Sequence, residues 1–229
     1  MTIGLTQEQK LSLVHECTDA SALFTRGLDM LASVRDDDTG AVAVMSLLAL
    51  GAEKMLKLTI GLATVDQGRP WPSKSEMRDI GHQVLAADSA ARPLLRRLRG
   101  TAPGHLTGLE AEVDADAILP VVLEALDRFG SAGRFYHLDV LAEAKQPAAS
   151  PRHLWHDATT AVMKQDPGLG AAIDGTTDHA VARRRWNNTM VTSLRTWWEM
   201  YYAAWRSGVI GDLAHQFAGE LKLRDIATV

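Results

Sequence analysis

The stretch AVAVMSLLALGAEKMLKLTIGLA, residues 41–63, determines how the rest of the chain folds. Hydrophobic residues recur in it every three or four positions, which is the period of an α-helix with one buried side. Its longest apolar run, residues 41–52, is shorter than the roughly 20 residues that a membrane-spanning helix needs. The stretch therefore predicts a long amphipathic helix in a protein core. Its predicted buried side consists of Val44, Leu48, Met55, Leu58 and Leu62.

The same helical period continues through most of the 229 residues, and alternating β-branched runs are absent. We therefore predict an all-α fold, an up-and-down helical bundle with a helical C-terminal extension. The bundle is expected over residues 1–146 and the extension, packed on the bundle, over residues 150–229. A single domain that includes both parts is the alternative.

Capping boxes, prolines and glycines predict where the helices begin and end. Thr6 with Gln9 opens the first helix, and Ser73 with Glu76 opens the third. Pro120 is an alternative first turn for the fourth helix, and the Gly- and Pro-rich residues 100–108 predict a loop. The predicted helices cover residues 7–34, 41–63, 73–99, 114–129, 134–146, 151–165, 178–206 and 209–223.

Charge and cysteine content limit the classes of function. The chain has 24 basic and 28 acidic side chains, a net charge of −4, so no overall basic field indicates nucleic acid or an acidic membrane. Cys17 is the only cysteine, which excludes an internal disulfide framework. With no charged and apolar leader at its start, the chain is expected to be a cytoplasmic protein.

A first candidate group lies on the helix over residues 41–63. Ser46, Glu53 and Lys57 share the side opposite the apolar one, and Glu53 and Lys57 have the i,i+4 spacing of an ion pair. One interpretation is a solvated polar face. The other places these side chains in a cleft or at a dimer seam.

Arg78 and His82 form the second group, four residues apart on the predicted third helix. A neutral histidine beside an arginine has the chemistry that RNA cleavage by a 2′-hydroxyl requires, with the arginine on the phosphate. The alternative is a surface or core histidine that a backbone group satisfies.

The third group, Arg134, Tyr136, His137 and Asp139, stands at a predicted helix start, where free backbone N–H groups favour anions. Arg134 and His137 are three residues apart, so both are expected to face one phosphate. Helix capping with a local ion pair of Arg134 is the alternative.

Two further groups are weighed against these. His153, His156 and Asp157 have the spacing of a metal site that lacks further ligands, which predicts a helical metalloprotein as a third class of function. Aromatic residues share one arc of the helix over residues 178–206, and they predict a core or an interface for a partner. That arc contains Trp186, Met190, Leu194, Trp197, Trp198, Tyr201 and Trp205.

Three short motifs resemble the HEPN superfamily of small prokaryotic helical bundles, in particular its abortive-infection (AbiV-like) branch. They are LGAEKMLK at residues 50–57, GHQVL at residues 81–85 and RFY at residues 134–136. The likeness covers about residues 7–145. It implies a dimeric bundle, often a metal-independent ribonuclease of toxin–antitoxin or antiphage systems.

The resemblance associates catalysis with a motif in which an arginine is followed, after four to six residues, by a histidine on the same helix. The chain departs from this motif. Arg99 and His105 have this spacing, but Gly100 and Pro103 between them exclude a regular helix. Two other pairs have only three intervening residues. These pairs are Arg78 with His82 and Arg152 with His156.

These observations predict a HEPN-like protein of a bacterial defence or toxin module that binds or cleaves RNA as a homodimer without a metal or cofactor. Arg78 or Arg134 is expected on the scissile phosphate, and His82 or His137 in proton transfer. Substrate binding is assigned to Glu53, Lys57 and Tyr136. The alternative is a non-catalytic protein that binds a protein partner through its Trp-rich C-terminal helix.

Overall fold

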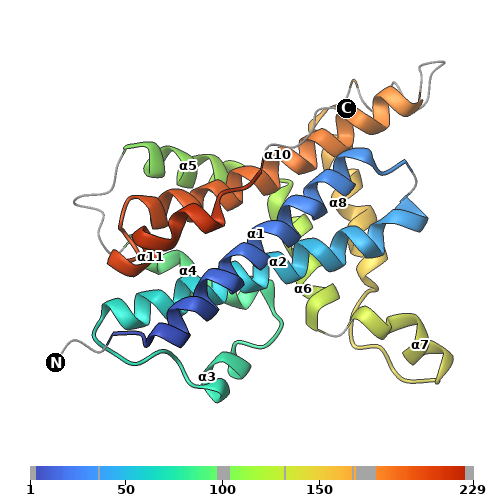
Figure 1. Ribbon diagram of the computed structural model, residues 1–229. Helices are drawn as coiled ribbons and strands as arrows, with labels where there is room; N and C mark the ends of the chain where they lie inside the picture. Colours follow the sequence, from blue (N-terminus) through green and yellow to red (C-terminus); the bar gives the residue numbers. More distant parts are fainter. Residues whose placement is uncertain are drawn as a thin grey trace.

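The computed structural model describes residues 4–35, 37–96, 104–131, 133–166, 168 and 179–224 (Figure 1). Every regular element in these ranges is a helix, which confirms the all-α prediction. The helices are α1 Gln7–Ser33, α2 Asp37–Asp66, α3 Lys74–Asp79, α4 Val84–Arg96, α5 Gly104–Ala115, α6 Leu119–Ser131, α7 Tyr136–Leu141, α8 Pro151–Gln165, α10 His179–Arg206 and α11 Asp212–Phe217, with 3-10 helices η1 Gly133–Phe135 and η2 Ala218–Leu221.

Helices α1 and α2 form an antiparallel hairpin through the middle of the bundle (Figure 1). They pack closely at Gly51, where a Cβ atom would lie only 2.9 Å from the backbone nitrogen of Phe24. The capping box of Thr6 and Gln9 starts α1 as predicted. Helix α2 begins at Asp37, before the predicted residue 41, and all five apolar side chains predicted on its buried side are buried.

The single helix predicted over residues 73–99 is wrong, because the chain turns at Gly81. This residue has φ +67°, a left-handed conformation that glycine adopts without steric cost. Two helices, α3 and α4, therefore replace the predicted one. Ser73 and Glu76 do form the predicted capping box at the start of α3.

The boundaries predicted for the next two segments are also wrong. Helix α5 begins at Gly104, inside the predicted loop. The carboxylate of Asp116 then accepts hydrogen bonds from the backbone N–H groups of Ile118 at 2.7 Å and Leu119 at 3.1 Å. Since this cap fixes the start of α6, Pro120 lies in the first turn, which is the alternative that the sequence offered.

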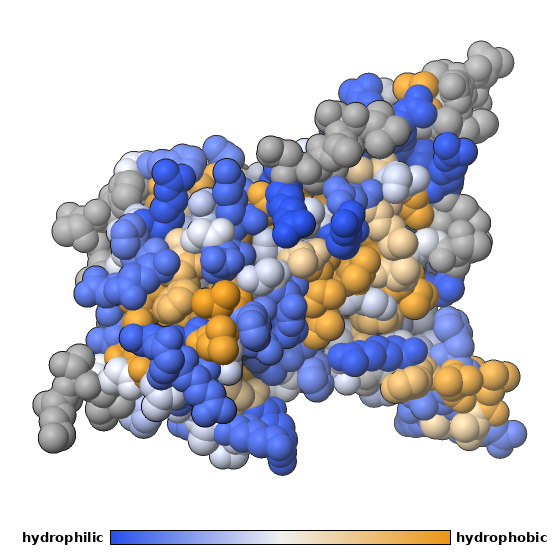
Figure 2. All heavy atoms as spheres, viewed as in Figure 1, coloured by the Kyte–Doolittle hydropathy of each residue, from blue (hydrophilic) through white to orange (hydrophobic). Residues whose placement is uncertain are grey.

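Helix α7 projects from the bundle and is much shorter than the helix predicted over residues 134–146 (Figure 1). It contains no buried residue, so it lacks the packing that stabilises most helices in proteins. Its apolar side chains, together with Phe135 of η1, form the exposed hydrophobic patch at the lower right of Figure 2. The exposed fractions are 62% for Phe135, 62% for Leu138, 48% for Val140 and 81% for Leu141.

The C-terminal helices contribute to the same hydrophobic core as the hairpin. Ser150 caps α8, with Pro151 in its first turn as predicted. Helix α10 packs against α1 and α5, and the aromatic side chains on its predicted arc are buried. They therefore form core, which confirms that interpretation and removes the exposed Trp-rich surface on which the partner-binding alternative depended.

Hydrogen bonds fix the indole rings of α10 within this core. The N–H group of Trp205 donates to the hydroxyl of Thr59 at 2.9 Å, and that of Trp198 donates to the carbonyl of Leu221 at 2.9 Å. The helix predicted over residues 209–223 is divided into α11 and η2. Among the described helices, none combines the length and the apolar character that crossing a membrane requires.

Candidate functional site

Glu53 is a buried carboxylate on α2 that binds two polar side chains. The residue is only 7% exposed. The ammonium group of Lys57 donates to its Oε1 atom at 2.8 Å, which confirms the predicted ion pair. The solvated face predicted here is wrong for Glu53, because a second side chain covers its carboxylate.

That second side chain is His82. Its Nδ1 atom lies 3.0 Å from Oε1 and 3.1 Å from Oε2 of Glu53. A carboxylate at Nδ1 favours the tautomer whose proton is on Nδ1, so Nε2 is left as an acceptor. The His82 side chain is 62% exposed, and Nε2 has no hydrogen-bond or ion-pair partner among the described residues. The imidazole therefore has one fixed nitrogen and one that is accessible.

Close backbone packing fixes the position of His82. It follows the turn at Gly81, and its carbonyl oxygen lies against Gly130 of α6, where a Cβ atom would be only 2.5 Å away. A side chain at position 130 cannot fit without displacing the backbone of His82. The tertiary contact thus aligns residues from α2, the turn before α4, and α6.

Arg134, four residues after Gly130 in the chain, contacts the same glycine. It lies in η1, is exposed, and donates from Nη2 to the carbonyl oxygen of Gly130 at 3.4 Å. Gly130 is therefore contacted both by the guanidinium of Arg134 and by the backbone of His82. We call Glu53, Lys57, His82 and Arg134 the Glu53–His82 site.

Other predicted residues lie differently from expectation. Arg78 and His82 do not share a helix, so their predicted i,i+4 geometry is wrong, and Arg78 is exposed on α3. The ring of Tyr136 is half-buried, with the guanidinium of Arg128 6.0 Å from its centroid. His137 contacts Tyr136 edge to face at 5.2 Å. Within the described ranges, neither Arg78 nor His137 has a carboxylate contact like the one that orients His82.

Two residues of the predicted metal-binding group on α8 contact each other. His153 Nε2 lies 3.8 Å from a carboxylate oxygen of Asp157, with both side chains largely exposed. In the ranges that the structure describes, no three histidine, cysteine, aspartate or glutamate residues are grouped to bind a metal ion. Arg99, which has the family's spacing to His105, lies outside the described ranges. Burial raises the pKa of the Cys17 thiol to about 12, so this cysteine is a poor nucleophile.

Sequence reasoning missed a buried polar cluster around Asp88 of α4. Its Oδ1 atom accepts hydrogen bonds from the indole of Trp197 at 2.8 Å and the phenol of Tyr201 at 2.7 Å. Its Oδ2 atom accepts from Arg92 at 3.1 Å, and Arg92 also binds Asp114 at 2.8 Å. Burial, together with the nearby Asp88, raises the pKa of Tyr201 well above its ordinary value. The phenol therefore remains a hydrogen-bond donor.

The helical periodicity of α4 indicates that Asp88 is buried. Asp88 lies on the same side of α4 as its small and apolar residues, where an unpartnered carboxylate is unfavourable. A buried partner could have been inferred from that pattern, although its identity could not. The buried residues of α4 are Val84, Ala87, Asp88, Ala91 and Leu95.

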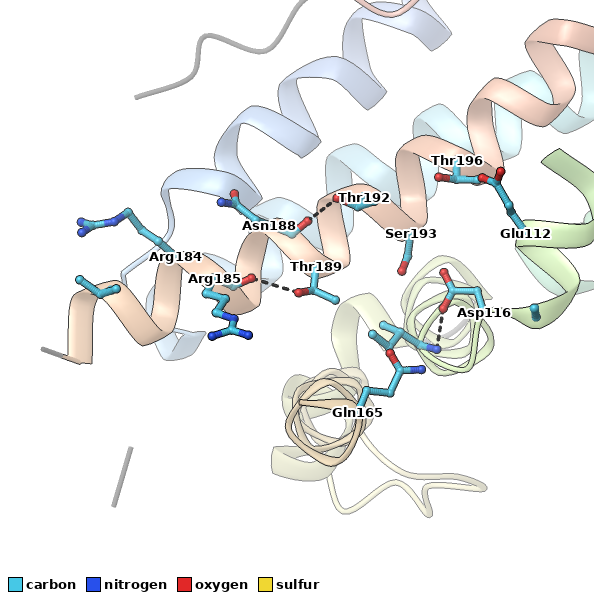
Figure 3. A pocket seen from close by; sticks show the side chains of 13 residues that line it. Glu112, Asp116, Gln165, Arg184, Arg185, Asn188, Thr189, Thr192, Ser193 and Thr196 are labelled. Atoms are coloured by element: carbon cyan, nitrogen blue, oxygen red, sulfur yellow. Dashed lines mark hydrogen bonds between the residues drawn. The ribbon is translucent and has the colours of Figure 1, made fainter. Parts of the chain in front are cut away.

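An open groove of about 910 Å³ lies where α10 faces α5, α8 and the start of α6 (Figure 3). Five polar residues of α10 line it: Asn188, Thr189, Thr192, Ser193 and Thr196. Arg184 and Arg185 lie at one end of the groove and Glu112 lies at the other (Figure 3). None of these residues was among the predicted site residues.

The chain was compared with protein-family models, with curated proteins and with solved structures, and none of them matches.

Proposed function

We propose that the protein binds single-stranded RNA at the Glu53–His82 site and cleaves it without a metal ion. The observation that carries this proposal is the contact of His82 Nδ1 with the buried carboxylate of Glu53 at 3.0 Å. A histidine oriented by a carboxylate, with its other nitrogen accessible, is a common arrangement for a general base. The motifs that resemble the HEPN superfamily include His82 and Glu53, which supports the same assignment.

The reaction uses the 2′-hydroxyl of the RNA as the nucleophile. His82 Nε2 removes the hydroxyl proton, and the 2′-oxygen forms a bond to the adjacent phosphorus. The bond from phosphorus to the 5′-oxygen breaks, and that oxygen takes a proton from water. The products are a 2′,3′-cyclic phosphate and a 5′-hydroxyl. Glu53 stabilises the imidazolium that forms, as a carboxylate does for other catalytic histidines.

Phosphate binding is assigned to the cations next to His82. Arg134 is exposed and binds the carbonyl of Gly130, the residue against which the His82 backbone packs, and an arginine pairs well with phosphate oxygens. Lys57 adds a positive charge beside Glu53. Phe135, 62% exposed and adjacent to Arg134, offers a ring on which an unpaired base can stack. Tyr136 is less suited to this task because Arg128 lies over its ring.

The test is an analysis of product ends after incubation of labelled single-stranded RNA with the purified protein and EDTA. The proposal predicts fragments with 2′,3′-cyclic phosphate ends. An RNA with a single 2′-deoxy residue at the main cleavage position should stay intact there. Intact RNA in the first reaction, or cleavage at the 2′-deoxy position in the second, would contradict the proposal.

We also propose that the protein is a homodimer. The resemblance implies a dimer, and the exposed apolar side chains of α7 support it, because patches of this kind mark interaction sites. Light scattering coupled to size-exclusion chromatography tests it directly. A mass near twice 24.9 kDa is the expected result, and a monomer at micromolar concentration would contradict it.

A further inference from the structure

Trp71 lies in the loop between α2 and α3 and has a proline on each side, Pro70 and Pro72. A proline fixes its own φ angle and restricts the residue before it to extended conformations. Arg69 and Trp71 both precede a proline, so the backbone of this short loop has little conformational freedom. The loop therefore presents the indole in a nearly fixed position.

The indole packs with one of its faces on α2 at Gly61. A Cβ atom at Gly61 would lie 2.6 Å from Cζ2 and 2.8 Å from Cζ3 of Trp71, and closer still to Cη2. These three neighbouring ring atoms are at similar distances, so the glycine lies against the face of the ring, because an approach to its edge would bring one atom clearly nearer than the others. The helix and the ring can be this close because glycine has no side chain. The opposite face of the indole is therefore turned away from α2.

That opposite face remains accessible in the part of the chain that the structure describes. Trp71 is only partly buried, no other ring and no cation stacks on it there, and its indole N–H has no acceptor among the described residues. The other five tryptophans are at most 6% exposed, and they are Trp155, Trp186, Trp197, Trp198 and Trp205. Trp71 is therefore the tryptophan whose ring a ligand can reach.

Trp71 and His82 contact the same side of α2. The indole packs on Gly61, and the imidazole binds Glu53, eight residues earlier on the helix. These two positions of α2 are about 12 Å apart along the helix axis and about 80° apart around it. Lys57 lies midway between them and is paired with Glu53, so recognition at Trp71 depends on the ring and not on charge. An RNA strand with a phosphate at His82 reaches Trp71 within a few nucleotides.

We propose that Trp71 is a binding subsite for an unpaired nucleobase of the RNA, which stacks on the outer face of the indole. The inference rests on the RNA binding proposed for the Glu53–His82 site, and it adds the part of that site that selects single strands. Every base has a planar face, so the subsite accepts all four bases. Bases inside a duplex already stack on each other and are not available to the indole. Trp71 contacts no reacting atom, so its role is binding and not catalysis.

Tryptophan fluorescence of the full chain tests the proposal with a single-stranded 2′-O-methyl oligonucleotide, which lacks the 2′-hydroxyl that cleavage requires. A base on Trp71 should quench part of the emission, and the buried tryptophans should not respond. An oligomer of the same length without bases keeps the phosphates and should not quench. Fluorescence anisotropy of a labelled oligonucleotide measures binding separately. No binding, binding without quenching, or equal quenching by the oligomer without bases would overturn the proposal.

Variants sharpen the test, with circular dichroism as the folding control. Trp71→Ala should weaken binding of the oligonucleotide at least about fivefold, because the stacked base loses its platform. Gly61→Ala should also weaken binding, since its Cβ atom displaces the indole, and Gly108→Ala, where a Cβ atom meets nothing within 4 Å, is its control. Tyr202→Ala removes a partly buried ring of α10 and should leave the affinity unchanged. An equal loss in Tyr202→Ala would overturn the proposal.

Single-turnover cleavage of RNA separates this subsite from the proposed reaction. Trp71→Ala should raise the protein concentration needed for half the maximal rate by about fivefold and leave the rate at saturation unchanged. If the unmodified protein cleaves RNA and Trp71→Ala has the same concentration dependence, the subsite is wrong and the reaction stands. If the oligonucleotide binds with quenching and RNA stays intact, the reaction is wrong and the subsite stands.

Discussion

The Nδ1 atom of His82 lies 3.0 Å from the carboxylate of Glu53, although the two residues are 29 positions apart in the chain. The Glu53 carboxylate is buried, whereas the histidine ring is 62% exposed. This combination orients the imidazole and keeps its second nitrogen accessible. The contact depends on the tight turn at Gly81 and on the close approach of the His82 backbone to Gly130.

Gly130→Ala tests that backbone contact. A Cβ atom would lie 2.5 Å from the carbonyl oxygen of His82, so we expect a loss of about 1–3 kcal/mol in the free energy of unfolding. Gly108→Ala is the matched control, because a Cβ atom there meets nothing within 4 Å. It should gain about 0.5–1 kcal/mol, as alanine favours a helix over glycine. Urea denaturation measures both, and similar changes in the two variants would contradict the packing described here.

Asp88 is expected to be a major determinant of stability. Asp88→Ala leaves a buried indole N–H, a phenol and a guanidinium without their acceptor, and should cost about 3–5 kcal/mol. Asp88→Asn retains an acceptor for Trp197 or Tyr201 and should cost less, about 1–2 kcal/mol. Thermal or urea unfolding followed by tryptophan fluorescence distinguishes the two. A loss below about 1 kcal/mol for Asp88→Ala would show that the cluster contributes little.

Asp127 should make stability depend on pH. Burial raises its pKa, and the hydrogen bond that it accepts from the backbone N–H of Leu85 at 2.9 Å lowers it by less. Because the folded-state pKa is the higher one, this contribution to stability is present below the unfolded pKa of about 4 and is lost as the pH rises through the raised value.

Asp127→Asn should reduce that loss, since it removes the charge and keeps an acceptor for Leu85. Urea denaturation between pH 4 and pH 7 measures the effect, with Asp79→Asn as the control because Asp79 is exposed. The prediction is wrong if both variants have the same pH profile as the unmodified protein.

The patch on α7 should mediate self-association and contribute little to folding. Leu138→Ser and Leu141→Ser replace side chains that are 62% and 81% exposed, so the free energy of unfolding of the monomer should change by less than about 0.5 kcal/mol. The double variant should shift a dimer to monomer in size-exclusion chromatography with light scattering. Leu11→Ser, at a residue 57% exposed on α1, is the control. Unchanged association in the double variant would exclude α7 from the interface.

Helical periodicity was enough to predict the all-α fold, the buried side of α2 and the buried arc of α10. Helix boundaries were less accurate because local turns decide them. The left-handed Gly81 divides the helix predicted over residues 73–99, and the carboxylate of Asp116 moves the start of α6 to the turn before Pro120. Neither the turn at Gly81 nor the Asp116 cap changes the periodicity of hydrophobic residues, so the periodicity could not reveal them.

The candidate site was predictable in its residue types and not in its geometry. The ion pair of Glu53 and Lys57 was predictable from their i,i+4 spacing, because both lie on one helix. The contact between Glu53 and His82 is a tertiary one, and a pairing rule within one helix cannot find it. Sequence reasoning therefore paired His82 with Arg78. The groove at Ser193 has a similar origin, since it arises where separate helices meet.

Cleavage of single-stranded RNA under single-turnover conditions, with EDTA present, tests the central claim most directly. His82→Gln should lower the rate at least about 100-fold, because it removes the general base. Glu53→Gln should lower it as well, because the imidazolium loses its carboxylate partner. His137→Gln, the same change at an exposed histidine with no carboxylate contact in the described ranges, should leave the rate unchanged. A His82→Gln protein that cleaves as fast as the unmodified one, or an unmodified protein that does not cleave RNA, would contradict the account.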